Sequence, residues 1–532
     1  MRLFILRAFL LVGLLGMCSC QKKHLPVSKK PSQTIRINFT YNPFSIDPRK
    51  CSDPITTTLC FMLYEGLTHL EPDGTVSLAL AESVKISKDR KTYLFHLRPS
   101  TWSDGTPLTA DHFEASWKRV LDPEFPSKTA HLLFSLKNGE KAKAGKCSLD
   151  MVGVKAIDEE TLWVELEKPI PYFLELTAFC TFFPAPCKNV DPPQIQQHTA
   201  FVCNGPFKLK SWVNDDKVVV QKNPTYWNQQ EVSLDEIHAT IISDETTALT
   251  LFEKGELDWV GGLISPLPLD ALSSLKQTSK LYQRPIAGTT FSSFNVNLYP
   301  FTNVNIRKAF AYAINRQDIV ENVSQMFDDV ATGPVPTVLK GTEDTRFFQD
   351  HAQELAQTHF KRGLQELGIT KEEFPRITYD YFSSELQRNL AISLQGIWKK
   401  VLGIEVQLNS HELKTHITKL YNRDFQFAQM SWIGQYHDRM NFLERFSKKE
   451  TLRNYSSWEN PLFAQLIAES FFKERAERTD LLEKAERIIT DEMPVIPLYH
   501  FHVVYVKSPS LKRVAISPMG DVQFHKAYLK GK

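Results

Sequence analysis

The sequence of 532 residues lacks several features that mark common classes of protein. Lys and Arg together number 63 against 61 Asp and Glu, so there is no basic excess and nucleic acid is not an expected partner. No Cys-x-x-Cys pair occurs, which argues against a zinc knuckle or a thioredoxin-type site. Internal repeats and low-complexity tracts are also missing. What remains is an ordinary globular composition, with 42% hydrophobic and 11% aromatic residues.

No enzyme signature is complete in this sequence. There is no Gly-x-Ser-x-Gly elbow. Residues 139–147 resemble a phosphate-binding loop but have one residue too many, and Cys147 stands where Ser or Thr is needed. His411, Glu412 and His416 resemble a zinc-protease motif, but histidines five positions apart on a helix lie about 140° apart. We interpret them as helix-surface residues, and a secreted hydrolase stays only a remote alternative.

Other titratable residues are interpreted as structural, so neither a metal nor a cofactor is expected. His500 and His502 alternate along a predicted strand and share a face, which is a weak pattern for a metal site. Four acidic pairs stand in polar surroundings and are interpreted as solvated surface: Glu159–Glu160, Asp215–Asp216, Asp328–Asp329 and Glu372–Glu373.

Long hydrophobic runs are absent as well. The apolar run Ala8–Met17 is too short to cross a bilayer comfortably. With Arg2 and Arg7 before it, the run is typical of a signal peptide, which we assign to residues 1–19. Removal of these two arginines would change the formal net charge from +2 to zero.

The end of this leader resembles a bacterial lipoprotein cleavage site, with Ser19 before Cys20. Met17 stands where such sites usually have Leu, and Cys18 is a weaker second candidate for acylation. Residues 20–33 are polar and contain proline, so we expect a lipidated tether. Export without a lipid is the alternative.

Six cysteines follow the leader, all within the first 203 residues. In an exported chain some of them are expected to form disulfides. The sequence leaves the pairing open among Cys51, Cys60, Cys147, Cys180, Cys187 and Cys203.

The stretch from residue 377 to 436 has the clearest local pattern. Alternating and helical periodicities predict strand 377–382, a helix stopped by Gly403, strand 404–408, helix 413–420 and a strand from Phe425. Such an order implies parallel strands with helical crossovers. Because ligands of open α/β sheets bind beyond the carboxyl ends of the strands, we expect a ligand at Ser431–Tyr436. Far downstream, residues 503–506 predict a strand that must return to an earlier sheet.

Six blocks in a fixed order carry a resemblance to one family. They are Ser45–Pro48, Tyr93–Phe113 around Trp102-Ser-Asp-Gly-Thr-Pro107, Asn204–Phe207, Pro224–Asn228, Pro300–Ala309 and Gly396–Ile404. Together they resemble the large extracytoplasmic solute-binding proteins of peptide ABC importers, over nearly the whole mature chain. The resemblance implies a binding protein rather than an enzyme, with an α/β two-lobed periplasmic-binding-protein fold and an extra inserted α+β domain.

The resemblance also implies a division of the chain. Lobe I would be assembled from residues 34–54, 183–287 and 502–532, the inserted domain from 55–182, and lobe II from 288–501. The C-terminal strand would then find its partner in lobe I. The protein would be a periplasmic monomer, held to the membrane only by its lipid, that serves the permease of an ABC transporter.

In the family the peptide lies extended between the lobes, paired with segments that match Tyr41–Phe44 and Ser431–Ile433 here. Strand-type hydrogen bonds to the peptide backbone would tolerate varied side chains. Trp432 is expected either in the core or in the pocket wall. The expected ligand-binding residues are Tyr41, Asn42, Phe44, Thr129, Phe291, Gln387, Gln429, Ser431, Trp432, Ile433, Gln435 and Tyr436.

The sequence departs from the family in its charges. Peptide-binding members commonly hold the ligand's ammonium with an aspartate, at the position that aligns with Gln435. Basic positions of some members are here Gln387, Leu420, Gln429 and Ser324, and an acidic one is Asn42. His437, Asp438 and Arg439 are nearby substitutes. We still expect a peptide. Free-amine peptides should bind more weakly here than to the aspartate-bearing members, or ligands without a charged end should be preferred. A particular short peptide or a non-peptide solute is the alternative.

Overall fold

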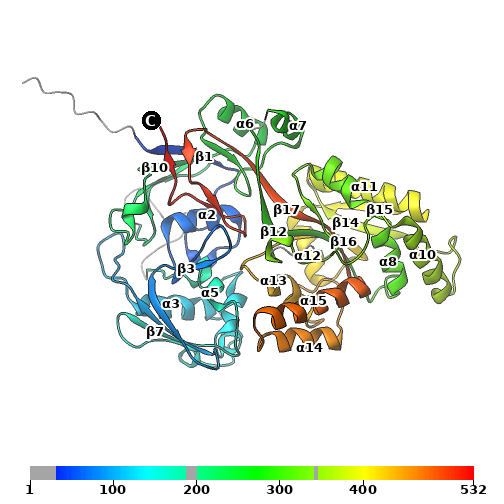
Figure 1. Cartoon of the computed structure of the whole chain (residues 1–532), viewed down its shortest axis with the longest axis horizontal. Coiled ribbons are helices and arrows are strands. Elements are labelled where there is room, and N and C mark those ends of the chain that lie inside the picture. The colour runs from blue at the N-terminus through cyan, green and yellow to red at the C-terminus, as the bar shows by residue number, and fades with distance from the viewer. Residues whose placement is uncertain (1–31, 187–200, 279, 341–345, 532) are drawn as a thin grey trace, which may run out of the picture.

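The structure, a computed structural model, describes residues 32–186, 201–278, 280–340 and 346–531 (Figure 1). The predicted signal peptide, Cys20, Cys187 and most of the tether lie outside these ranges.

Eleven strands form one mixed sheet that runs through the molecule. They are β1 (Thr34–Phe39), β8 (Phe207–Val213), β9 (Lys217–Lys222), β10 (Glu236–Ile241), β11 (Trp259–Gly261), β12 (Tyr282–Phe294), β13 (Asp329–Val330), β14 (Ile377–Phe382), β15 (Val406–His411), β16 (Phe427–Ile433) and β17 (Val495–Lys507). Their order is β15-β14-β16-β12-β17-β11-β1-β10-β9-β8, with β13 paired to β17.

The helices that follow β10 in the chain lie around this sheet (Figure 1). At the end that holds β1 are α6 (Glu245–Glu253) and α7 (Leu269–Gln277). Toward the other end are α8 (Val304–Tyr312), α9 (Arg316–Ile319), α10 (Gln353–Leu367), α11 (Glu385–Leu402) and α12 (Leu413–Asn422). Below the middle of the molecule in Figure 1 are α13 (Met440–Leu443), α14 (Pro461–Ser470) and α15 (Arg475–Glu492).

Between β1 and β8 the chain forms a separate α+β unit. It contains α2 (Pro54–Leu63), β2 (Thr68–Leu70), β3 (Val76–Leu78), β4 (Ala81–Ile86), β5 (Thr92–Leu97), α3 (Ala110–Leu121), α4 (Gly139–Lys143), β6 (Val154–Ala156), β7 (Thr161–Glu165) and α5 (Phe173–Leu176). Strands β4, β5, β7 and β6 pair in that order as an antiparallel sheet, and β2 pairs with β3.

The predicted strand–helix–strand–helix–strand order between residues 377 and 433 is confirmed. β14 pairs in parallel with β15 on one side and with β16 on the other. Ser384 caps the first helix, α11, by accepting a hydrogen bond from the backbone N–H of Gln387, and Gly403 ends it with φ +68°. That left-handed conformation is one that glycine adopts without the penalty of a Cβ atom. The carboxyl end of β16 therefore lies at the edge of the sheet where the sequence places a ligand.

An aromatic cluster fixes the first residue of β16. Phe427 is fully buried. Its ring lies 4.3 Å from that of Phe294 on β12, 4.9 Å from Tyr379 on β14 and 5.2 Å from Trp398 on α11. Aromatic pairs at such distances add to the stability that area burial already gives. β16 is thus held from both neighbouring strands and from the helix above them.

The strands β12 and β17, with 13 residues each, are the longest in the sheet and cross between the two ends of the molecule (Figure 1). Their antiparallel pairing is interrupted between Pro285 and Thr289, where three residues of β12 face one of β17. The lobe boundaries predicted at 287/288 and 501/502 fall inside this interruption and stay a prediction. The predicted C-terminal strand is confirmed as part of β17, which pairs with β11 and β12.

The chain ends in two small antiparallel pairs beside the first part of the sheet. They join β18 (Leu511–Lys512) to β21 (Tyr528–Leu529), and β19 (Ala515–Ile516) to β20 (Val522–Gln523).

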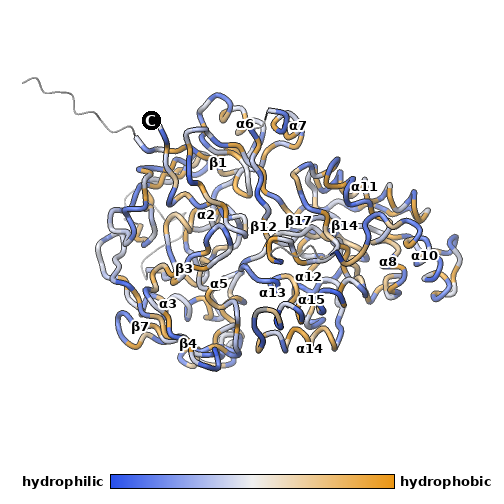
Figure 2. Tube along the Cα trace, viewed as in Figure 1, coloured by the Kyte–Doolittle hydropathy of each residue, from blue (hydrophilic) through white to orange (hydrophobic). Residues whose placement is uncertain are grey.

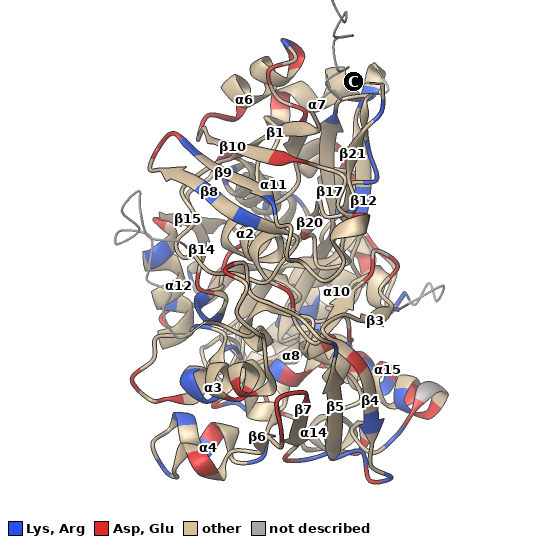
Figure 3. Cartoon of the chain, turned by 90° about the vertical axis from the view of Figure 1, so that its left-hand side faces the viewer, with Lys and Arg blue, Asp and Glu red and all other residues tan. Residues whose placement is uncertain are grey.

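Polar and apolar residues alternate along the outer helices α10 and α11 (Figure 2), as expected for helices that bury one face. On the side shown in Figure 3, basic and acidic residues are interspersed. None of the helices in the described ranges has the length and apolar character needed to span a bilayer.

The described cysteines are unpaired thiols: Cys51, Cys60, Cys147, Cys180 and Cys203. The disulfides expected from the sequence are therefore not formed among these five. Three of the thiols come together in the interior, as described below.

Candidate ligand-binding site at the end of strand β16

The predicted site residues on β16 divide between the two faces of the strand. Residues 428, 430 and 432 face one side and 429, 431 and 433 the other, because side chains alternate along a strand. β12 pairs antiparallel with this whole segment, from Gly288 opposite Ile433 to Phe294 opposite Phe427. Phe291, opposite Met430, therefore shares a face with Trp432.

Trp432 lies half-buried between two cations. The guanidinium carbon of Arg445 is 4.6 Å from the centre of its ring and that of Arg453 is 4.7 Å from it. The indole N–H donates to Asn441 Oδ1 at 2.9 Å. Arg445 also lies 5.6 Å from the rings of Phe291 and Tyr455. Contacts of this kind between cations and aromatic faces are favourable, most of all when they are desolvated.

Gln435 links the end of β16 to the α+β unit. Its Oε1 lies 3.1 Å from Nε2 of His131, and a nitrogen of Arg453 lies 2.9 Å from that Nε2 and 3.5 Å from the Gln435 oxygen. Burial, and then the charge of Arg453, lowers the pKa of His131 to about 3, so its ring is neutral at pH 7. The position at which the resemblance predicts an aspartate thus holds a neutral amide, next to a neutral histidine and the cation of Arg453.

Tyr436 is buried and makes the second contact with the α+β unit. Its ring stacks on that of Tyr172, with centroids 4.5 Å apart and an interplanar angle of 6°. Its hydroxyl donates to Glu444 Oε1 at 2.9 Å. Burial raises the pKa of Glu444.

On the other face of β16, Ser431 and Gln429 contact polar side chains of neighbouring elements. Ser431 Oγ lies 2.8 Å from Thr290 Oγ1. The side-chain amide of Gln429 donates to Gln387 Oε1, and both glutamines are buried. No described charged side chain is hydrogen-bonded to either glutamine amide.

The first predicted segment has contacts of its own. Tyr41 stacks on Phe44 with centroids 5.4 Å apart, and the Phe44 side chain is 71% exposed. Asn42 exchanges hydrogen bonds with Asp215. The contacts named for this segment are thus within the segment and with Asp215, not with β16. Its part in ligand binding stays a prediction.

Thr129 is buried within the α+β unit. Its hydroxyl lies 2.7 Å from Thr181 Oγ1 and 3.3 Å from the carbonyl oxygen of Cys51. The contact with Gln435 is made by His131, two residues after Thr129.

Sequence reasoning missed Arg445, Arg453, His131 and Tyr172. Arg445 and Arg453 follow the end of β16 by 12 and 20 residues and belong to no periodic pattern. Their positive charge, close in sequence to the predicted site, is the sequence feature that could have indicated a role in the site.

The substitutes that the sequence suggested are engaged elsewhere. Asp438 pairs with Arg478 through two bonds of 2.7 Å. Arg439 donates to the carbonyl oxygens of Leu339 and Lys340.

The interpretation of His411 and His416 as helix-surface residues is wrong. His411 ends β15 and pairs with Asp380 at 2.5 Å. His416, on α12, is buried and its Nε2 donates to the carbonyl oxygen of Gln429 at 2.8 Å. The spacing argument assumed that both histidines lie on one helix. In the structure His411 is the last residue of β15 and His416 lies on α12.

The interpretation of Asp328 as solvated is also wrong. The residue is buried, and its Oδ1 accepts a hydrogen bond from the backbone N–H of His502 at 2.8 Å.

Comparisons with known proteins place the chain among solute-binding proteins. The sequence model described as "Bacterial extracellular solute-binding proteins, family 5 Middle" matches residues 75–453. Oligopeptide-binding protein OppA of Bacillus subtilis (strain 168) is 39% identical over 509 residues, 94% of this chain and 93% of that protein. A second relative, "Probable deoxycholate-binding periplasmic protein YgiS" of Escherichia coli (strain K12), is 30% identical over 516 residues, 94% of each chain.

Among solved structures, the Escherichia coli murein tripeptide binding protein MppA superposes with a TM-score of 0.80 at 28% identity. The match covers 94% of this chain and 99% of that one. The predicted two-lobed α/β fold and the prediction of a binding protein rather than an enzyme are confirmed, and the hydrolase alternative falls.

Proposed function

Because the chain belongs to family 5 of the bacterial extracellular solute-binding proteins, we propose that it captures oligopeptides between two lobes and delivers them to the permease of an ABC importer. It acts outside the cytoplasm as a monomer, held to the membrane by a lipid on Cys20. Relatives named for oligopeptide and murein tripeptide binding support a peptide ligand.

The observation that carries the proposal is the meeting of distant segments at the end of β16. Gln435 and Tyr436, near the C-terminal end of the matched region, contact His131 and Tyr172 from the α+β unit. A ligand held there contacts both the end of β16 and the α+β unit. Its binding therefore favours the arrangement in which these two parts lie close together. Hinge closure of this kind is the usual response of periplasmic binding proteins.

The experiment that tests the proposal is native mass spectrometry of freshly purified protein. We expect a peptide released intact on denaturation, and exchange for added peptides without cleavage. Protein that carries no peptide and takes up none from a mixed peptide pool overturns the proposal.

The second candidate is a non-peptide solute. A relative named for deoxycholate binding and the neutral Gln435 favour it. In the same measurement it would be recognised as a bound mass without amino-acid fragments.

A further inference from the structure

Two arginines meet on the ring of Trp432, one residue inside the end of β16. Arg445 is 4% exposed and lies among the rings of Phe291, Trp432 and Tyr455, within 5.6 Å of each. Arg453 lies 4.7 Å from the Trp432 ring. The side chains around the two guanidinium groups are aromatic, and the nearest acid named for either of them is Glu444, which accepts the hydrogen bond of Tyr436.

The terminal nitrogens of Arg445 have no hydrogen-bond partner within the described chain. Both nitrogens, Nη1 and Nη2, are buried and donate to no described acceptor. Burial lowers the pKa of Arg445 to about 10, so the group keeps its charge at neutral pH. Arg453 is hydrogen-bonded to His131 and Gln435, both neutral, and the charge of Glu444 acts on both arginines. Buried charged donors whose hydrogen bonds are not made are costly, and such groups are normally paired.

We propose that Arg445, with Arg453 beside it, binds a carboxylate of the ligand. The proposal rests on the proposed function and names its substrate class: peptides that carry an anionic group at the end of β16. A guanidinium presents N–H donors in a planar fork that matches the two oxygens of a carboxylate. Phe291 and Trp432, both predicted to be ligand-binding, supply the apolar walls that keep water away.

The same charges disfavour the opposite ligand end. An ammonium at Gln435 would lie beside the guanidinium of Arg453, which is 3.5 Å from the amide oxygen. The carboxylate can come from the peptide's C-terminus or from an Asp or Glu side chain, and the experiment separates these sources.

The test is calorimetry with four N-acetylated pentapeptides of alanine. The central residue is Glu or Gln, and the C-terminus is free or amidated. The carboxylate-bearing peptides should bind about 30-fold or more tighter than the doubly neutral one, the loss expected when a buried charge is left without its partner. Whether affinity falls with Glu→Gln or with amidation identifies the source.

The outcomes separate the two proposals. Equal affinity for charged and neutral peptides overturns the carboxylate site and leaves peptide binding intact. If no peptide binds, including versions with free amino ends, both proposals fail.

Variants test whether Arg445 acts on the ligand or on the fold. Arg445→Met should abolish the preference for carboxylates and leave the Tm of ligand-free protein unchanged or higher, because it removes a buried charge whose terminal donors make no described hydrogen bond. Arg362→Met, on α10, is the matched control: that arginine is exposed and pairs with Glu366 at 2.9 Å. A lower ligand-free Tm with an unchanged carboxylate preference would make Arg445 a structural residue and overturn the site.

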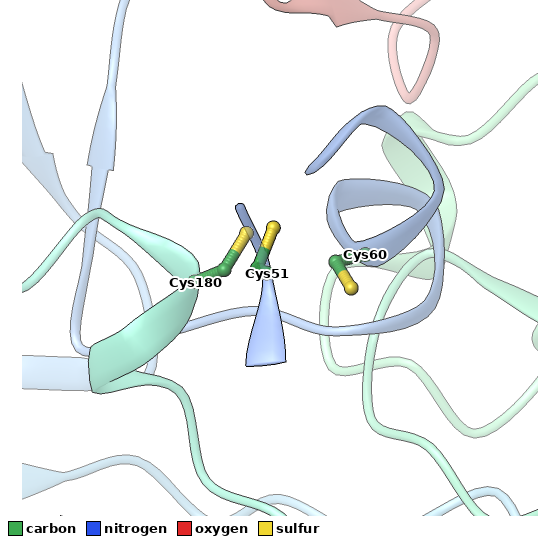
Figure 4. A group of neighbouring side chains, drawn as sticks. All are labelled: Cys51, Cys60 and Cys180. Carbon is green, nitrogen blue, oxygen red and sulfur yellow. The ribbon is translucent and has the colours of Figure 1, made fainter. Parts of the chain in front are cut away.

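A second site, independent of the first, is formed by three cysteines (Figure 4). Cys51 follows a short 3-10 turn, Cys60 lies on α2, and Cys180 begins another turn. All three are fully buried, and their sulfur atoms lie within 4.8 Å of one another. Oγ1 of Thr57 is 3.0 Å from Sγ of Cys51.

The geometry also points to a thiophilic metal ion at these sulfurs, and we assign Cu(I) to it. An ion about 2.3 Å from each of three sulfurs holds them roughly 4 Å apart, which the cluster allows. Thiolates select Cu(I) and Zn(II), but structural zinc takes four ligands, and no fourth His, Cys, Asp or Glu of the described chain joins this group.

The test is anaerobic titration of reduced protein with Cu(I) against a chromogenic chelator, and separately with Zn(II). We expect one Cu(I) per chain, lost in Cys51→Ala, Cys60→Ala and Cys180→Ala and retained in Cys203→Ala, whose thiol is buried elsewhere. Protection of the three thiols from alkylation by bound Cu(I) checks the wild type if a variant misfolds. Uptake of zinc alone, no uptake, or a disulfide within the cluster in protein purified without reductant overturns the assignment.

Discussion

Tyr436, three residues beyond β16, stacks on Tyr172 of the α+β unit with ring centroids 4.5 Å apart. These two residues are 264 positions apart in the sequence. Their contact therefore depends on how closely the α+β unit approaches the end of β16. Arg478 lies 5.8 Å from the same Tyr172 ring, and Gln435 meets His131 beside it.

We predict that bound ligand favours the close approach of the α+β unit to the end of β16. Loss of the Tyr172–Tyr436 stack should then weaken ligand binding. A stacked aromatic pair contributes about 0.5–1.5 kcal/mol beyond its buried area, so Tyr172→Ala should weaken ligand binding by roughly 2- to 12-fold. Small-angle scattering should show a more compact wild-type protein with saturating ligand. Phe472→Ala, a change of a 69% exposed aromatic, is the control. Identical dimensions with and without ligand would contradict closure.

The second prediction concerns Gln435. The sequence alone predicts that Gln435→Asp tightens binding of free-amine peptides, since a carboxylate beside an ammonium makes a charge-assisted hydrogen bond. Arg453 lies 3.5 Å from the amide oxygen and would pair with the new carboxylate instead. The gain, about 10-fold or more, should therefore need Arg453→Gln as well.

Calorimetry on free-amine and N-acetylated versions of one peptide checks this, with each single variant as a control. Equal improvement of both peptide forms, or of neither, would mean that Gln435 does not meet the ligand's amino end.

The third prediction follows from Asp328, whose pKa burial raises to about 7. A carboxyl whose pKa is higher in the folded than in the unfolded state stabilises the fold at low pH and loses this contribution as pH rises through 7. Between pH 5 and pH 8 the loss is about 2–3 kcal/mol. Asp328→Asn, which keeps the acceptor for the His502 N–H, should lose less stability over this range. Urea unfolding at both pH values measures the difference, and equal losses in variant and wild type would place the Asp328 titration near its ordinary value.

The fourth prediction concerns the anchor. Cys20 lies outside the described residues, and Ser19 before it together with the polar tether predicts acylation. Intact-mass analysis of membrane-extracted protein should show a mature chain that begins at Cys20 with added acyl mass, lost in Cys20→Ser. A mature N-terminus elsewhere, or Cys18 as the acylated residue, would contradict this assignment.

The fold could be predicted wherever its cause is local. β14 to β16 follow from periodicity, and the end of α11 from Gly403, because these signals lie within a few residues of the elements they set. The prediction that a ligand binds at the end of β16 followed from topology alone, and it stays a prediction.

The chemistry of the site could not be predicted in the same way. His131 meets Gln435 across 304 residues, and Arg445 reaches Trp432 from a turn without a pattern. Single-sequence periodicity carries no information about such meetings. His416 was misplaced for a related reason: its burial depends on β16, whose carbonyl oxygen it binds.

The strand order has a consequence for how the molecule is made. β17 lies between β12 and β11, and so joins the two halves of the sheet although it begins only at Val495. When about nine-tenths of the chain has been synthesised, β17 has therefore not yet been made. The sheet stays in two unlinked pieces until the last strands emerge, which favours a chain that crosses a membrane before it folds.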